Sequence, residues 1–526
     1  MVLPFFVLGI PSGHDFEFHL NSWMDVSSQW RQGILYPRWA HQAQWGYGEA
    51  RFIFYPPISW TLGALLGMIL PWQFVPAAYV WVALTLSGCS MFILAREWLE
   101  GRDAIFAAAL YALNPYYLLI VYWRSAFAEL LAGALLPLLL LYVLRLERKK
   151  WRAALPLALV CAVVWLTNIP SAVMLNFSLF GLVVLLACIR RSLRLLLWCA
   201  LAAGLGAGLA AFYLVPVVFE RKWVQIAQVL APGVRPQDNF LFTYIRDADH
   251  DRFNLLVSLM AAGEMLLLAA AAFYSRRWRN RSPLLWWALV IWALAAAGLM
   301  FAFTSLGWRF LPLLRFVQLP WRWLLCLNVA FSLLVTMAWK RSPMRILVYG
   351  TMLVVLALAW HRLQPPWWDT KADIWEMQEN ERYGPGYEGT DEYVPAGADP
   401  YEVKHDAALV VFTGQSQAHF RLQRWAPESK VFVADSPGAG TLALRLFNFP
   451  AWKVEVNAHV VNARTDEATG QMLIPVEAGE NYVRITFIRT WDRTLGGIVS
   501  LATGLSMCGL FLAWRSPSTA AVAARL

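Results

Sequence analysis

Two carboxylates and two imidazoles lie within six residues near the start of the chain, directly after an apolar stretch at 1–10. They are His14, Asp15, Glu17 and His19. Ionisable side chains beside a hydrophobic segment are costly to place, and near a bilayer they indicate a functional site. A carboxylate against a low-dielectric wall is partly desolvated, which suits it to act as a general base near neutral pH. We therefore take Asp15 and Glu17 as candidate catalytic residues, with His14 and His19 beside them.

The sequence leaves two other interpretations of this cluster open. The four residues are ordinary polar residues next to a membrane segment, or they bind a divalent metal ion. Their spacing matches no specific ligand motif, so no metal ligand is assigned. Asp15 and His19 are four residues apart and would share one face of a helix.

A second charged pair, Glu49 and Arg51, precedes Tyr55 and the Pro56-Pro57 dipeptide. Arginine suits a phosphate or a sugar hydroxyl, and an aromatic ring can stack on a sugar. The alternative is a loop anchored by an internal salt bridge. All three side chains are candidates for substrate binding.

Two further groups of charged residues lie next to apolar segments. Arg124 and Glu129 occupy an expected hairpin between two such segments, where a charge needs a partner or a ligand, so they are candidate binding residues or a structural ion pair. Arg315, Gln318 and Arg322 lie on an expected outer loop. Arginines there either bind an anion such as phosphate or extend to lipid headgroups.

Composition identifies a membrane protein. The 526 residues are 59% hydrophobic and only 15% charged, whereas soluble domains carry roughly 25% charged residues. The net charge of +10 does not indicate nucleic-acid binding, because the basic residues form short clusters between apolar runs, as in cytoplasmic loops. The six cysteines form no CxxC motif, and no nucleotide-binding motif is present.

The apolar runs predict about twelve crossings. Basic clusters that begin at Arg96, Arg145, Arg190 and Arg276 are expected in the cytoplasm. With a first crossing at 1–12, this leaves 57–70 as a helix on the outer leaflet rather than a crossing. The expected crossings are 1–12, 76–95, 104–122, 126–145, 153–169, 171–189, 195–218, 254–274, 284–303, 321–339, 346–361 and 496–514.

Three regions follow from this topology. They are a transmembrane module at 1–361 with a long outer loop at 12–75, an extracytoplasmic domain at 362–495, and a last transmembrane helix with a cytoplasmic tail at 496–526. The middle region opens with a loop-rich stretch and then alternates short strand-like runs with turns, which predicts an antiparallel β-sandwich. The expected strands are Ala408–Thr413, His419–Trp425, Lys430–Val433, Thr441–Phe447, Trp452–Val456, Gln471–Pro475 and Tyr482–Ile488.

This layout resembles the GT-C superfamily of membrane glycosyltransferases. The shared features are an acidic pair, Asp15-Phe16-Glu17, after the first apolar segment, a long outer loop with a Pro-Pro helix, many spans and an outer C-terminal domain. The chain is also similar to YfhO-like and 6-pyruvoyl-tetrahydropterin-synthase-related bacterial membrane proteins. The stretches that carry this likeness are Asn114-Pro-Tyr, Thr167-Asn-Ile-Pro170, Arg315-Phe-Val-Gln-Leu-Pro-Trp-Arg322 and Asn448-Phe-Pro-Ala-Trp452.

The resemblance implies a sugar transferase at the outer face of the bacterial inner membrane. Its donor would be a polyprenyl-phosphate-linked sugar in the membrane lipid, and its acceptor a glycan, lipid or protein, with no nucleic-acid partner. The catalytic role of the acidic residue after the first helix carries over to Asp15, with Glu17 as its alternative. No cofactor is assigned, and a divalent metal ion remains one of the alternatives. A transporter or flippase of lipid-linked glycans, and a non-enzymatic envelope assembly protein, are the alternative functions.

Overall fold

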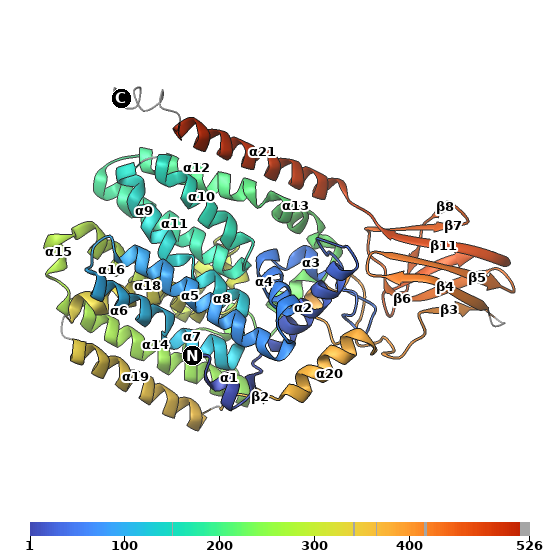
Figure 1. Cartoon of the computed structure of the whole chain (residues 1–526), viewed down its shortest axis with the longest axis horizontal. Helices are drawn as coiled ribbons and strands as arrows, with labels where there is room; N and C mark the ends of the chain where they lie inside the picture. The colour runs from blue at the N-terminus through green and yellow to red at the C-terminus, as the bar shows by residue number, and fades with distance from the viewer. Residues whose placement is uncertain (150, 340–341, 364, 415–417, 516–526) are drawn as a thin grey trace.

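The computed structural model describes residues 1–149, 151–339, 342–363, 365–414 and 418–515. Figure 1 shows a long helical body with a small β domain beyond one end. The helices α2 (Phe16–Arg31), α3 (Arg51–Phe54) and α4 (Pro57–Ile69) lie at the end of the body that faces the β domain. The last helix, α21 (Trp491–Arg515), runs back from the β domain along the side of the body.

Seven helices in the described chain are long and apolar enough to cross a membrane. Such helices satisfy all of their backbone hydrogen bonds internally, as the hydrocarbon core requires. The protein is therefore a multi-pass membrane protein. The seven are Trp72–Ala95 (η1 and α5), Gly101–Arg124 (α6, α7 and η2), Phe127–Leu146 (α8 and most of α9), Ile169–Arg190 (α11), Ala248–Tyr274 (α14), Pro320–Ala338 (η8 and α18) and Trp491–Leu512 in α21.

Two further helix pairs are bent too sharply to be simple spans. Arg194–Leu209 (α12) and Ala211–Trp223 (α13 and η3) meet at 76°, and Pro283–Leu299 (α16) and Ala302–Phe310 (η6 and α17) meet at 88°. Counting each pair as one span gives up to nine in the described residues. The predicted total of twelve is not confirmed by the described residues. The segments α4 and α10 (Trp151–Trp165) are shorter apolar helices, and α19 (Ser342–Leu363) contains another.

The predicted first crossing at 1–12 is wrong. Its only helix is α1 (Pro4–Val7), which has four residues, far short of the ~20 that a spanning helix needs. The strand β1 (Ile10–Pro11) then pairs with β2 (Trp368–Asp369). Glycine and proline at positions 9 and 11 interrupt the apolar run. The start of the chain is instead tied to the segment that leads to the β domain.

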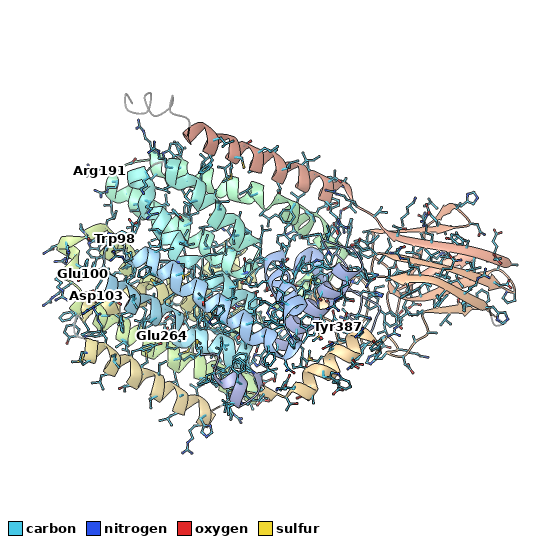
Figure 2. All side chains as sticks on the ribbon, viewed as in Figure 1. Trp98, Glu100, Asp103, Arg191, Glu264 and Tyr387 are labelled. Atoms are coloured by element: carbon cyan, nitrogen blue, oxygen red, sulfur yellow. The ribbon has the colours of Figure 1, made fainter. Side chains whose placement is uncertain are left out.

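Charged residues of the predicted cytoplasmic loops gather at the end of the body opposite the β domain. Figure 2 shows Arg191, Glu100 and Asp103 there, while Tyr387 lies at the β-domain end and Glu264 lies between them within the helical body. The assignment of this end to the cytoplasm stays a prediction from the basic clusters.

The β domain contains two antiparallel sheets around one apolar core. Their strand orders are β3-β6-β10-β9 and β4-β5-β11-β7-β8. Buried and outward residues alternate along β11, as expected for a sheet with one covered face. All seven predicted strands are present, and β8 and β9 are additional. The bounds are β3 Val410–Thr413, β4 His419–Ala426, β5 Ser429–Ser436, β6 Gly440–Phe447, β7 Trp452–Val456, β8 His459–Val461, β9 Arg464–Thr465, β10 Gln471–Val476 and β11 Gly479–Phe487.

The first long loop forms part of the β-domain core. Trp39 is fully buried and packs against Phe449 and Trp452, and Tyr47 packs against Phe447. The motif Asn448-Phe-Pro-Ala-Trp452 thus joins the β domain to the loop that follows α2.

The loop-rich stretch predicted before the β domain contains a helix, α20 (Lys371–Arg382), which packs against α2. The buried carboxyl of Asp25 on α2 accepts hydrogen bonds from Gln29 Nε2 (2.9 Å) and from the hydroxyl of Tyr387 (3.3 Å). Burial raises the pKa of Asp25 to about 6. Burial, together with the nearby Asp25, also raises the pKa of Glu381 on α20 to about 7.

This pair of carboxyls should make the docking of α20 depend on pH. A carboxyl whose pKa is raised by folding stabilises the folded state at low pH, and this contribution disappears as the pH rises through the folded-state pKa. The contribution of Glu381 should therefore disappear as the pH rises through about 7. Glu381→Gln should make the protein more stable than wild type at about pH 8, by ~1–3 kcal/mol, with little difference at about pH 5. The check is thermal unfolding across this range, with the exposed Glu376→Gln as control; equal unfolding curves for both variants would contradict the assignment.

Candidate functional site

Asp15 is fixed at the N-terminal end of α2 by a close approach of two chain segments. The N–H of Gly13 donates to Ser125 Oγ (2.9 Å), and the N–H of Asp15 donates to the carbonyl of Arg124 (2.8 Å). A Cβ at position 13 would lie 2.4 Å from the carbonyl oxygen of Trp123. Only glycine fits here, so the Gly13 contact sets the position of Asp15 beside Arg124.

The opposing segment has an irregular backbone. Helix α7 (Pro115–Leu119) continues into a π-helical turn, η2 (Ile120–Arg124), and Ser125 then adopts a left-handed conformation with φ 50°. Ser125 Oγ donates to the carbonyl of Pro11 (3.0 Å), so one serine binds both sides of the contact. Single π turns within helices are frequent at functional sites.

Four charged side chains form one network around Glu129, which lies on α8 (Phe127–Gly133). Glu129 Oε2 lies 2.6 Å from Arg124 Nη1 and 3.0 Å from Arg322 Nε. The hydroxyl of Tyr116 donates to Glu129 Oε1. Arg124 Nη2 also lies 3.4 Å from Asp15 Oδ2. Two guanidinium groups and two carboxylates thus balance in charge.

Exposure separates the two carboxylates. The side chain of Glu129 is 1% exposed and that of Arg124 is 4% exposed, whereas that of Asp15 is 40% exposed. Within the described chain, Arg124 is the only side chain that hydrogen-bonds the carboxylate of Asp15. Glu129 therefore neutralises the buried arginines, and Asp15 is the carboxylate of the network that an incoming molecule can reach.

The predicted outer loop reaches this network through Arg322 and Gln318. Arg322 Nη1 donates to Gln318 Oε1 (3.0 Å) and to the carbonyl of Val317 (2.7 Å). Gln318 has φ 65° and ψ −61°, and the N–H of Leu319 donates to the Val317 carbonyl across it (2.7 Å). This is a strained γ-turn, and strain of this kind clusters at functional sites. Arg315 lies apart from the network: it is exposed and stacks over the Phe316 ring.

The three polar neighbours of Asp15 have separate surroundings. His19 is buried against Phe127 and Tyr55, and burial lowers the pKa of His19 to about 4, so its ring is neutral near pH 7. Glu17 is exposed at the surface; partial desolvation, with Asp369 and Glu388 nearby, raises its pKa. His14 is exposed and contacts other aromatic rings. No cluster of three or more His, Cys, Asp or Glu that could hold a metal occurs among the described residues.

Glu49 and Arg51 form a fully buried ion pair, as in the alternative interpretation of this motif. Arg51 Nε lies 2.6 Å from Glu49 Oε1, and the two side chains are 1% and 0% exposed. Arg51 Nη1 donates to Ser22 Oγ on α2 (2.9 Å), and the N–H of Thr390 donates to Glu49 Oε2 (2.9 Å). The pair ties the first loop to α2 and to the segment before the β domain. Tyr55 lies against Phe18 and His19 of α2.

The two Asn-Pro-type motifs are helix caps. Asn114 Oδ1 accepts the N–H of Tyr117 (2.8 Å) at the start of α7, and Asn168 Oδ1 accepts the N–H of Ser171 (3.0 Å) at the start of α11. Asparagine at the cap and proline in the first turn both favour helix initiation. The first cap positions Tyr116 against Glu129.

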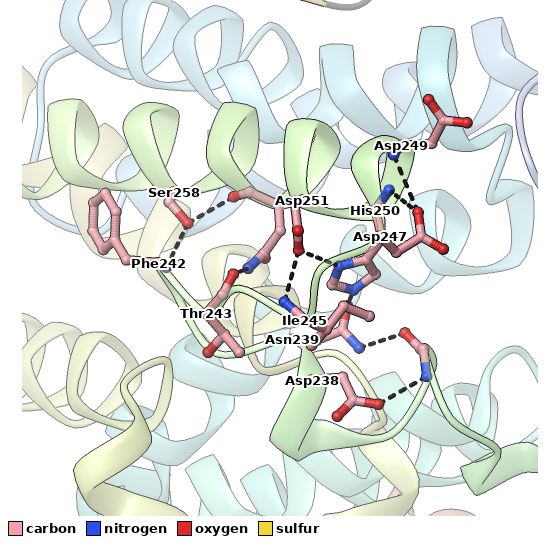
Figure 3. Close-up of polar contacts among 12 residues, drawn as sticks. Asp238, Asn239, Phe242, Thr243, Ile245, Asp247, Asp249, His250, Asp251 and Ser258 are labelled. Atoms are coloured by element: carbon pink, nitrogen blue, oxygen red, sulfur yellow. Dashed lines mark hydrogen bonds and ion pairs between the residues drawn. The ribbon is translucent and has the colours of Figure 1, made fainter.

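A further acidic cluster lies at the N-terminal end of α14 (Figure 3). Asp247 Oδ1 accepts the N–H groups of Asp249 and His250 (3.1 Å each), and Asp251 Oδ1 accepts the N–H of Ile245 (2.8 Å). The His250 ring lies between Asn239 and Asp251. These contacts cap the helix and hold its preceding loop, so the cluster has a structural role.

The sequence does not reveal the roles of three residues at or near the site. Two of them, Tyr116 and Trp321, contact the charged network: the Tyr116 hydroxyl donates to Glu129, and the Arg124 guanidinium lies 5.0 Å from the centre of the Trp321 ring. Glu264 was overlooked as a lone carboxyl in the apolar run of α14. It is buried, and its Oε2 accepts a hydrogen bond from Asn328 Nδ2 (3.2 Å). A single acidic residue in a spanning segment was the available signal.

Residues 52–364 match the 6-pyruvoyl-tetrahydropterin synthase related domain, a family described as a membrane protein. The chain belongs to this family, since the match covers more than half of its length. A comparison with curated proteins finds no match. The matched region contains Arg124, Glu129 and Arg322, whereas Asp15 and the β domain lie outside it.

Gly13→Ala should displace Asp15 from Arg124. The added Cβ meets backbone atoms of Trp123 and Arg124, which cannot rotate away. We expect a loss of stability of ~1–3 kcal/mol, measured by thermal unfolding of the detergent-purified protein. Gly204→Ala is the matched control, because a Cβ there would contact nothing within 4 Å. Equal stability of both variants would refute the close approach.

Proposed function

We propose that this protein is a membrane glycosyltransferase of the GT-C type. It would transfer a sugar from a polyprenyl-phosphate donor to a glycan, lipid or protein acceptor on the extracytoplasmic face of the bacterial inner membrane. One observation carries the proposal: a half-exposed carboxylate, Asp15, lies beside a buried array of arginines whose own charge Glu129 neutralises.

The reaction assigns a role to each part of this network. The acceptor hydroxyl oxygen forms a bond to the anomeric carbon, the bond from that carbon to the phosphate oxygen breaks, and polyprenyl phosphate leaves. Asp15 takes the hydroxyl proton as a general base. Arg124 holds the Asp15 carboxylate in place, and Glu129 holds Arg124. Arg322 positions Glu129 and Gln318 from the opposite side.

The leaving phosphate needs a cation, and the buried arginines are already paired. Arg315 is exposed on the same loop as Arg322 and forms no ion pair among the described residues. It is the arginine of this loop that we assign to the phosphate. Glu17 is exposed on the first turn of α2 and is the alternative base.

Asp15→Asn should lower sugar transfer by 10²- to 10⁴-fold, the range for loss of a general base. The measurement is release of labelled sugar from polyprenyl-phosphate donors by the protein in lipid nanodiscs, supplied with membrane acceptors. Glu17→Gln is the matched control and should retain most activity. Full transfer by Asp15→Asn would refute the base assignment, and loss in Glu17→Gln alone would move that role to Glu17.

Glu264 favours a second function, a transporter or flippase of lipid-linked glycans. Carboxyls buried within spans mark transport pathways in many membrane proteins, and Glu264 Oε1 and Asn328 Oδ1 lack hydrogen-bond partners in the described structure. The two functions differ in the residue whose substitution should abolish activity. A transporter should lose glycan translocation in Glu264→Gln and keep it in Asp15→Asn, whereas the transferase should show the reverse order of sensitivity.

A further inference from the structure

A small basic cavity lies apart from the Asp15 network, between the first long loop, α13 (Ala211–Glu220) and the start of α21. Its volume is about 210 Å³. Three arginines line it: Arg38 from the loop after α2, Arg489 from the short segment after β11, and Arg493 from the first turn of α21. Phe212 and Pro216 of α13 contribute an apolar wall.

Arg493 is the fixed member of the three. Its Nε and Nη2 each lie 2.7 Å from a different oxygen of Glu220, and its Nη1 donates to the carbonyl of Ile488 (3.2 Å). The side chain is 6% exposed. Each of its guanidinium nitrogens already donates one hydrogen bond, so Arg493 is the most constrained cation in the wall. Asp492 is buried beside Glu220 and does not line the cavity.

Arg38 and Arg489 retain free donors. Arg38 makes one long contact, 3.4 Å from Nη1 to Glu428 Oε1, and its side chain is 24% exposed. Arg489 is exposed; its Nη2 donates to the carbonyl of Arg493 (3.4 Å), and no carboxylate pairs with it in the described chain. Burial lowers the pKa of Arg38, and the charges of Arg493 and Arg489 lower it further, whereas the carboxylate of Glu428 raises it. Arg489 and Arg493 thus lie close enough to Arg38 to repel its charge.

A second, apolar groove of about 720 Å³ lies along the same helices, lined by α12, α13 and α21 residues such as Leu214 and Val218. Its lining includes Arg221 and Lys222, both exposed and without an ion pair in the described chain. Helix α21 is only 11% buried over its apolar window, so this side of the protein faces the bilayer. A lipid chain can therefore reach the helices that also form the basic cavity.

We propose that the basic cavity binds a phosphate group, with Arg38 and Arg489 as its ligands and Arg493 as the fixed charge behind them. Guanidinium groups with several free donors suit the oxygens of a phosphate monoester or diester. The bound phosphate would relieve the repulsion among the three arginines. Its source is either a lipid headgroup at the membrane surface or a free phosphate. This proposal does not depend on the transferase activity.

The test is isothermal titration calorimetry on the full chain in lipid-free detergent micelles. One titrant is inorganic phosphate and the other is a short-chain phosphatidic acid. The variant Arg38→Gln/Arg489→Gln should bind at least tenfold more weakly than wild type. The control Arg421→Gln/Arg464→Gln removes the same charge from exposed strands of the β domain and should bind like wild type.

Each outcome decides the proposal. Binding of both ligands that the arginine variant loses supports a site for phosphate from either source, and binding of phosphatidic acid alone supports a lipid headgroup. Binding of neither ligand to wild type, or equal binding to wild type and the arginine variant, overturns the site. If the double variant fails to fold, the exposed Arg489→Gln replaces it and should weaken binding in the same direction.

Discussion

The structure around the site depends on the ion pairs that the buried carboxylate of Glu129 forms with two arginines. Two guanidinium groups from distant segments, Arg124 and Arg322, bind this one side chain. A buried charge without a partner is strongly destabilising, and Glu129 supplies the shortest carboxylate contact of each arginine. Two irregular backbone segments, the π turn before Ser125 and the γ-turn at Gln318, present these arginines to it.

The same charged network determines the position and the exposure of the Asp15 carboxylate. It joins the network through a longer contact to Arg124 and keeps much of its carboxylate exposed. The backbone contact at Gly13 and the β1–β2 pair fix the segment that carries Asp15, and α4 and α20 pack against α2. The accessible carboxylate therefore lies on a rigid support at the end of the helical body, as a general base requires.

Local patterns in the sequence predicted much of the fold, and failed where distant contacts decide the structure. Alternating residues located the seven long strands, and apolar runs located the main spans. The charged motif at 124–129 contained a true ion pair, but its third member lies 193 residues away from Glu129. No pattern in one sequence shows such a contact. The Glu49–Arg51 pair turned out to be an internal anchor, because only the fold reveals whether an arginine faces a partner or open space. The hydrophobicity of residues 1–12 predicts a membrane crossing, but the glycine and proline at positions 9 and 11 interrupt the helix that a crossing needs.

The central claim is that Glu129 neutralises the two buried arginines, and a double-mutant cycle tests it most directly. Thermal unfolding would be measured for Glu129→Gln, Arg322→Gln and the double variant in detergent. Glu129→Gln alone should cost about 3–5 kcal/mol, because it leaves buried arginine charge uncompensated. The double variant should be less destabilised than the sum of the two single variants, by more than about 1 kcal/mol. Additive effects, or a Glu129→Gln protein as stable as wild type, would contradict the claim.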